Sequence, residues 1–227
     1  MILVLSALIA AAAPDAAVAC PQDDSPTALV CRALAAEGQG QPDAAAQRFE
    51  QAAAAYGQGP ERDRALAAAG NMWIVAGQPG KAALALDRAL AGTGLQAEQR
   101  GLALLDRARA AEAQNDLKTA RARVEEAKAT AAEDPFLWYF SAALAIREGD
   151  KAVAQSAINR ALSLAPSDAT VLFEAGHVAH FTGDLAKARD YWTRAAAAAP
   201  DNPSGKAAKE ALALLDKPVE TRGAATK

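Results

Sequence analysis

The chain contains two histidines, and these are the first residues to consider as a chemical site. His177 and His180 lie three residues apart, and Glu174 precedes His177 by the same interval, so one helix face would carry all three. Imidazole and carboxylate groups are competent ligands for a transition metal. A stable zinc site, however, needs three or four converging ligands with supporting hydrogen bonds, and the sequence offers these candidates alone. We therefore interpret the histidines as solvated or partly buried side chains, and we expect no metal and no cofactor.

Other catalytic constellations are not apparent in the sequence. Catalysis would need a nucleophile with a base, a metal cluster or a phosphate cradle, and a phosphate-binding loop requires a glycine-rich turn between a strand and a helix. No segment has that setting. We predict that the protein is not an enzyme, and a metal-dependent function at His177 and His180 is the least favoured alternative.

Both cysteines, Cys20 and Cys31, lie near the amino terminus. In an exported protein they would form a disulfide that ties the N-terminal segment to the first helix, with a stabilisation of about 2–3 kcal/mol on the chain-entropy model. A competing interpretation makes Cys20 the lipidated first residue of a lipoprotein, but Ala17 stands where such signals usually have a leucine-like residue. If neither modification occurs, Cys31 is a small core residue.

Residues 1–19 have the pattern of a secretory signal. Residues 1–14 carry no charged side chain, residues 2–13 form an apolar run too short to span a bilayer, and Ala17-Val18-Ala19 supplies a small-x-small cleavage pattern. No Lys or Arg precedes the run, so either the amino group supplies the charge or the true start lies upstream. The alternative is a short N-terminal helix that is buried or frayed. We predict export to the periplasm, or a lipid anchor to the envelope through Cys20.

Composition restricts the class of partner. The 227 residues are 52% hydrophobic, 5% aromatic and 22% charged with a net charge of −3, as in an ordinary soluble protein. Lys and Arg are scattered, and no basic stripe with interleaved aromatic residues appears. We therefore exclude nucleic acid as a partner and expect membrane contact only if Cys20 is lipidated.

An alanine that recurs about every 34 residues reveals the elements that must position these side chains. Its copies are Ala45, Ala82, Ala120, Ala154 and Ala188. Four residues after each comes a larger apolar side chain: Phe49, Leu86, Val124, Ile158 and Trp192. Seven residues after each comes another alanine: Ala52, Ala89, Ala127, Ala161 and Ala195. This period predicts a tandem helical hairpin, and such hairpins must stack because one alone cannot bury its apolar face.

Turn and packing residues support the same units. Asp150 and Asp184 follow glycine and would cap the second helix of the last two hairpins, whereas Pro42 and Pro79 would start that helix in the first two. Small residues on each first helix predict a close crossing with the second: Ala33, Gly70, Ala108, Ala142 and Gly176. Larger residues would fill the space beside them: Leu29, Leu66, Leu104, Trp138 and Leu172.

This pattern resembles the tetratricopeptide repeat (TPR) family. The resemblance covers five copies, at residues 26–59, 63–96, 101–134, 135–168 and 169–202, with three residues inserted after the first copy and four after the second. It implies an all-α fold, an α-solenoid of tandem antiparallel hairpins wound as a right-handed superhelix. Residues 203–216 would form a capping helix, which completes a domain over residues 20–217. The composition of residues 217–227 predicts a disordered tail.

In the TPR family, the first helices line a concave groove through their second, fifth, ninth, twelfth and thirteenth positions. Carried over to this chain, the resemblance implies a groove that displays Asn71, Ile74, Arg109, Glu112, Tyr139, Arg147, Phe173, His177, His180 and Phe181. Aromatic anchors and arginines suit an extended peptide or a helix. The alternative is that these are ordinary solvent-facing or cap-facing side chains.

Some family members hold a chaperone's C-terminal carboxylate with a clamp of Lys, Asn and Arg side chains. Asn71 matches one clamp position, but Ala67 stands where the first lysine belongs. Leu102 and Leu105 also offer no cation or amide, so this specific function is not supported.

These observations predict a non-catalytic scaffold that binds a protein or peptide partner. By resemblance, bacterial envelope proteins of this type assist assembly of outer-membrane, secretion or cytochrome-maturation complexes. The alternative is a self-associating repeat protein, a homo-oligomer in which alanine-rich convex faces meet or the groove holds another copy.

Overall fold

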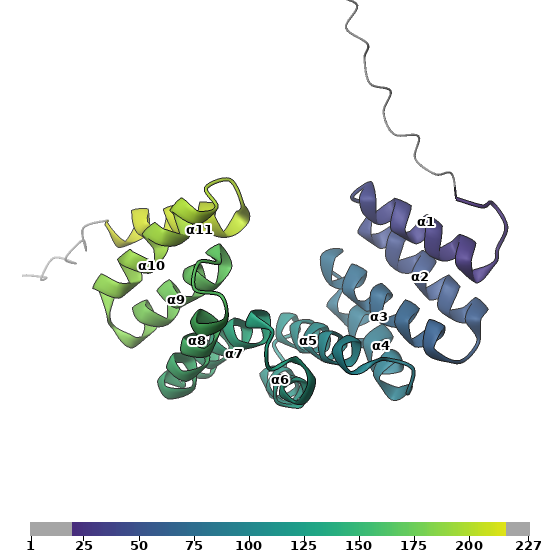
Figure 1. Ribbon diagram of the computed structural model, residues 1–227, viewed down its shortest axis with the longest axis horizontal. Helices are drawn as coiled ribbons and strands as arrows, with labels where there is room; N and C mark the ends of the chain where they lie inside the picture. The colour runs from purple at the N-terminus through teal and green to yellow at the C-terminus, as the bar shows by residue number, and fades with distance from the viewer. Residues whose placement is uncertain (1–19, 217–227) are drawn as a thin grey trace, which may run out of the picture.

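The computed structural model describes residues 20–216, and within them it contains helices joined by short turns and no strand (Figure 1). Five helical pairs follow one another and an eleventh helix ends the array. The helices are α1 (Pro26–Gly38), α2 (Pro42–Tyr56), α3 (Pro60–Val75), α4 (Pro79–Ala91), α5 (Ala97–Ala113), α6 (Leu117–Ala131), α7 (Pro135–Glu148), α8 (Lys151–Leu164), α9 (Ala169–Thr182), α10 (Leu185–Ala198) and α11 (Pro203–Leu215). The predicted all-α array of stacked hairpins is confirmed.

The array is curved, with α1 and α11 at its two ends (Figure 1). First helices such as α5 and α9 lie on the inner side of the curve, and their partners α6 and α10 lie on the outer side. The predictions for residues 1–19 and 217–227 fall outside the described residues. Within residues 20–216, no helix is both long and apolar enough to cross a membrane.

Repeated local signals determine where each helix begins. A side chain accepts a backbone N–H at the start of seven helices, and these caps are Ser25, Asp116, Asp134, Asp150, Asp168, Asp184 and Asn202. The predicted caps Asp150 and Asp184 are therefore confirmed. Helices α2, α3 and α4 lack such a cap and begin with Pro42, Pro60 and Pro79, where the missing N–H costs nothing.

The inserted residues lengthen two first helices at their amino ends. Residues 60–62 and 97–100 form the first turns of α3 and α5, which are 16 and 17 residues long, whereas α7 and α9 have 14. The amino end of α3 is attached to the next loop through Asp63, whose buried carboxylate accepts the Gly94 N–H at 3.0 Å. The same carboxylate lies 2.8 Å from the Arg62 guanidinium, so its charge is balanced where it is buried.

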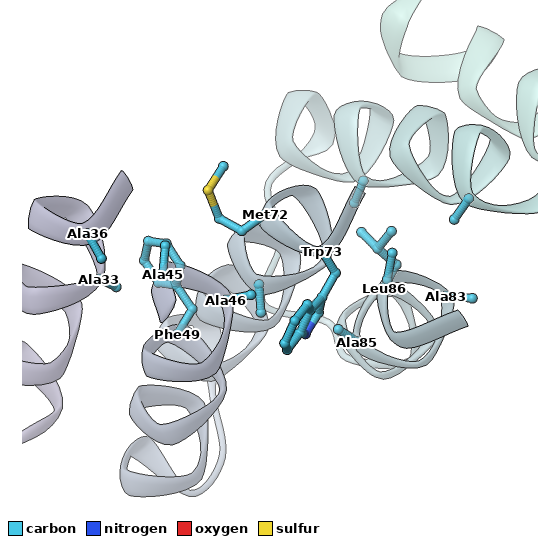
Figure 2. Close-up of a cluster of buried hydrophobic side chains, with 14 residues drawn as sticks. Ala33, Ala36, Ala45, Ala46, Phe49, Met72, Trp73, Ala83, Ala85 and Leu86 are labelled. Atoms are coloured by element: carbon cyan, nitrogen blue, oxygen red, sulfur yellow. The ribbon is translucent and has the colours of Figure 1, made fainter. Parts of the chain in front are cut away.

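The core consists of buried clusters along the array, in which small side chains surround a few large ones. All ten repeat alanines, at both positions of the pattern, have no exposed surface. Figure 2 shows this arrangement at the N-terminal end, where Phe49 faces Ala33 and Ala36 of α1 and Trp73 lies between α2 and α4. Because close-packed interiors have no spare volume, these alanines hold adjacent helices at short distance.

Glycine replaces alanine where the opposing side chain leaves the least room. A Cβ atom added to Gly70 would overlap the Leu86 side chain, and one added to Gly176 would overlap the Trp192 indole. The predicted close helix crossings are confirmed at these positions. Trp138 is only partly buried, and its indole N–H donates to the Ala132 carbonyl oxygen at 2.7 Å.

A disulfide joins Cys20 to Cys31 and holds the segment before α1 against that helix, with the two Cα atoms 5.6 Å apart. Arg32 strengthens the attachment by donating to the carbonyl oxygens of Pro21 and Asp23, at 2.6 and 2.8 Å. At the other end of the array, Ala208 of α11 is fully buried in a cluster with Trp192. The disulfide thus attaches the N-terminal segment to α1, and α11 covers the C-terminal end of the stack.

Candidate binding surface

Two hollows lie on the surface that the first helices form. The N-terminal pocket, between α1, α3 and α5, has a volume of about 370 Å³, and Leu34, Asn71, Leu102 and Asp106 are among its lining residues. The C-terminal pocket, between α7 and α9, has a volume of about 420 Å³ and is lined mainly by Ile146, Arg147, Glu174, His177, His180 and Phe181. Since α3, α5, α7 and α9 are first helices, both pockets belong to the inner side of the curve (Figure 1).

A polar network lies beside the apolar wall of the N-terminal pocket. Asn71 Nδ2 donates to Asp106 Oδ2 at 2.8 Å, and Arg109 donates to Asp106 Oδ1 at 3.0 Å. The carboxylate is mostly buried, and this burial raises the pKa of Asp106 above its ordinary value despite the two donors. The pocket therefore combines apolar walls with a partly desolvated acid.

Aromatic side chains link the two pockets. The Arg109 guanidinium lies 5.8 Å from the centre of the Phe136 ring, within range of a cation–π interaction. Phe136 in turn meets Tyr139 edge-on, with ring centres 5.1 Å apart. Burial, followed by the negative charge of Glu174, raises the pKa of Tyr139 to about 12, so its hydroxyl stays protonated at physiological pH.

The two histidines form part of the C-terminal pocket. The Nδ1 atom of His177 lies 3.4 Å from the Glu174 carboxylate, and the His177 ring lies edge-on to Phe173 at 4.3 Å. The ring of His180 lies 5.9 Å from the Trp192 ring. Within the described residues, no group of three or more His, Cys, Asp or Glu side chains is placed to hold a metal ion.

Residues 137–168 match the family model described as tetratricopeptide repeat, and this segment contains most of α7 and all of α8. The same helical pair is repeated along the described chain in the stacked arrangement seen above. Residues 137–168 therefore form a tetratricopeptide repeat, and the described chain is a stack of such helical pairs. No protein of curated function matches it.

Several solved structures share this fold. A thermophilic TPR protein of Thermus thermophilus is 17% identical with a TM-score of 0.67, and the match covers 84% of this chain and 100% of that one. PilW, a type IV pilus biogenesis factor, is 18% identical with a TM-score of 0.67, covering 81% and 82%. YrrB, a TPR protein with an unusual peptide-binding site, is 16% identical with a TM-score of 0.57, covering 83% and 94%. At these identities the similarity establishes the fold alone.

The residues expected in the TPR groove occupy three kinds of place. Those that line a pocket are Asn71, Arg147, His177, His180 and Phe181. Arg109 and Tyr139 belong to the link between the pockets, and Glu112 forms an ion pair with Arg147. Ile74 and Phe173 pack against buried clusters and line neither pocket.

Several residues that line the pockets were not expected from the sequence: Leu34, Glu37, Arg64, Leu102, Asp106 and Ile146. The same positional rule selects most of them, since Leu34 and Glu37 stand at the ninth and twelfth positions of the first repeat and Leu102 at the second position of the third. Asp106 stands at a sixth position, which the rule does not include. Its presence in the pocket depends on how α3 and α5 meet.

Proposed function

We propose that this TPR protein is a non-catalytic scaffold that binds a segment of a protein partner along the inner surface of its curve. The observation that carries the proposal is the pair of open pockets on successive first helices, linked by Arg109, Phe136 and Tyr139. An extended or helical segment can engage both pockets at once, and a stiff surface loses little entropy when it captures one. The peptide-binding site named for the similar protein YrrB supports this proposal.

The proposed location of this scaffold is the cell envelope, after export. Structural disulfides persist in oxidising compartments, and Cys20 and Cys31 are joined in this chain. A Cys20 sulfur in that disulfide is not available to carry a lipid. The similarity to a type IV pilus biogenesis factor favours a role in assembling an envelope complex.

Site-specific photo-crosslinking in the native host tests the binding surface. A photoreactive amino acid replaces Leu102, which lies in the N-terminal pocket and is 48% exposed, or Leu84 of the outer helix α4, which is 69% exposed. We expect one partner to be captured from position 102 and not from position 84. Capture from position 84 alone would place the interface on the outer face, and capture of further copies of this chain would indicate self-association.

The mass of the purified mature protein tests the location. Cleavage before Cys20 with an intact disulfide gives a chain that begins at Cys20 and is two hydrogens lighter than its reduced form. A mass that includes residues 1–19, or acyl groups on Cys20, would contradict the proposed processing.

A further inference from the structure

The N-terminal pocket presents large apolar side chains that no other part of the described chain covers. Leu34 of α1 and Leu102 of α5 line the same hollow and are 55% and 48% exposed. The nearly buried side chains of Phe49 and Met72 complete its apolar lining. Exposed leucines that line the same hollow favour an apolar side chain of an occupant, because its burial removes its own surface and that of the leucines from water.

The charges around this pocket favour a cation beside that apolar side chain. The one basic lining residue, Arg64, is engaged at 2.8 Å by Glu61. The acidic residues that line the pocket are Asp106 and Glu37. The Asp106 side chain is 15% exposed, whereas Glu37 is exposed and has no ion-pair partner among residues 20–216. Arg109 balances the charge of Asp106, so Glu37 leaves an uncompensated negative charge at the pocket.

Asp106 retains hydrogen-bonding capacity toward an occupant. Asn71 donates to one of its oxygens and Arg109 to the other, and an ionised carboxylate offers about four acceptor positions. A lysine or arginine side chain of an occupant could therefore donate to a group that is already oriented by two neighbours. Charge-assisted hydrogen bonds of this kind are roughly twice as strong as neutral ones.

We propose that the N-terminal pocket selects partner segments in which a Leu, Ile, Met or Phe side chain lies next to a Lys or Arg. The apolar side chain enters between Leu34 and Leu102, and the cation reaches Asp106 and Glu37. This inference rests on the proposed function, and it specifies which chemistry the scaffold recognises.

The partly desolvated carboxylate of Asp106 stands to gain from a cation of an occupant. Since burial raises its pKa, the folded protein favours the protonated carboxyl, and this contribution to stability is lost as the pH rises past its ordinary pKa. At neutral pH the ionised carboxylate is therefore less well stabilised in the folded protein than in water. A bound cation would offset that difference.

A displayed random-peptide library, selected against the full purified protein, tests the inference. The variants are Asp106→Asn, Leu102→Ser and, as a matched loss of one acidic charge outside the pocket, Glu210→Gln on the exposed face of α11. Circular dichroism and thermal melting confirm that each variant is folded under the conditions of the selection. The most enriched peptide is then synthesised and its affinity measured by fluorescence polarisation.

We expect the natural protein and Glu210→Gln to enrich peptides with a basic residue beside a large apolar one. Asp106→Asn should lose the preference for a basic residue. It should also weaken binding of the synthetic peptide about 10-fold to 100-fold, as loss of a hydrogen bond to a charged group implies. Leu102→Ser should lose the apolar preference. Enrichment without a basic residue, or a motif unchanged in Asp106→Asn, would overturn the inference and leave the scaffold proposal standing. A folded protein that enriches no peptide would overturn both.

Discussion

Gly176 shows at the scale of a single residue how tightly two helices meet. Its missing Cβ makes room for the Trp192 indole, whose N–H donates to the Phe173 carbonyl oxygen at 3.1 Å. An alanine at this position must displace either a large ring or the backbone of α9. This position requires glycine for its small size and not for its backbone freedom, because residue 176 lies inside a regular helix.

We therefore predict that Gly176→Ala lowers the free energy of unfolding by about 1–3 kcal/mol, the usual cost of overpacking a core. Gly80→Ala is the matched control, since nothing lies within 4 Å of a Cβ at that position in α4. At that position the substitution should raise the free energy of unfolding by about 0.4–1 kcal/mol, because alanine reduces the conformational entropy of the unfolded chain. Urea unfolding of both variants measures the difference, and equal effects at the two glycines would contradict the packing argument.

Tyr139 provides a prediction on pH. Its pKa is raised to about 12, above the ordinary value of 10.0, so the unfolded chain ionises first as the solution becomes alkaline. The stability that the protonated tyrosine contributes is present below about pH 10 and is lost as the pH rises toward 12. Urea unfolding of the natural protein and of Tyr139→Phe across this range isolates the effect. Parallel pH profiles for the two proteins would show that Tyr139 is not its source.

At the scale of the element, the disulfide between Cys20 and Cys31 attaches a segment without helix to α1. We predict that replacing both cysteines with serine lowers stability by about 2–3 kcal/mol on the chain-entropy model. Because each hairpin packs mainly against its neighbours, hydrogen exchange should accelerate in α1 and α2 and remain unchanged in α9 and α10. A uniform acceleration along the array would mean that the repeats unfold as one unit.

The elements themselves were largely predictable, because alanine spacing, capping aspartates and helix-starting prolines are local signals that act within one hairpin. The structure of the inserted residues was harder to predict, because no local signal distinguishes a longer loop from the extra helical turns that begin at Pro60 and Ala97. The pockets were predictable only in part. A positional rule states which side chains lie on the inner face, but the exposure of Leu34 and the burial of Asp106 depend on how successive hairpins approach one another.

At the scale of the whole molecule, the curved array has two ends that must be covered, and α11 covers one of them. Its Ala208 is fully buried against the cluster that contains Leu172, Ala195 and Trp192, with Leu212 partly buried beside them. Removing α11 would expose this cluster to water and leave the main contacts among α1 to α8 in place, because α11 packs mainly against α10 and α9.

We therefore predict that a chain ending at Asp201 loses stability first at its C-terminal end. In a stack of repeats, stability is approximately a sum of each unit and its interfaces, so the uncapped fifth repeat should open while the first repeats remain folded. Hydrogen exchange should then show fast opening in α9 and α10 that diminishes toward α5, and Trp192 fluorescence should report the exposed indole. If the truncated chain instead opened equally in α1 and α10, coupling along the array would exceed nearest neighbours, and binding at one pocket would be transmitted to the other.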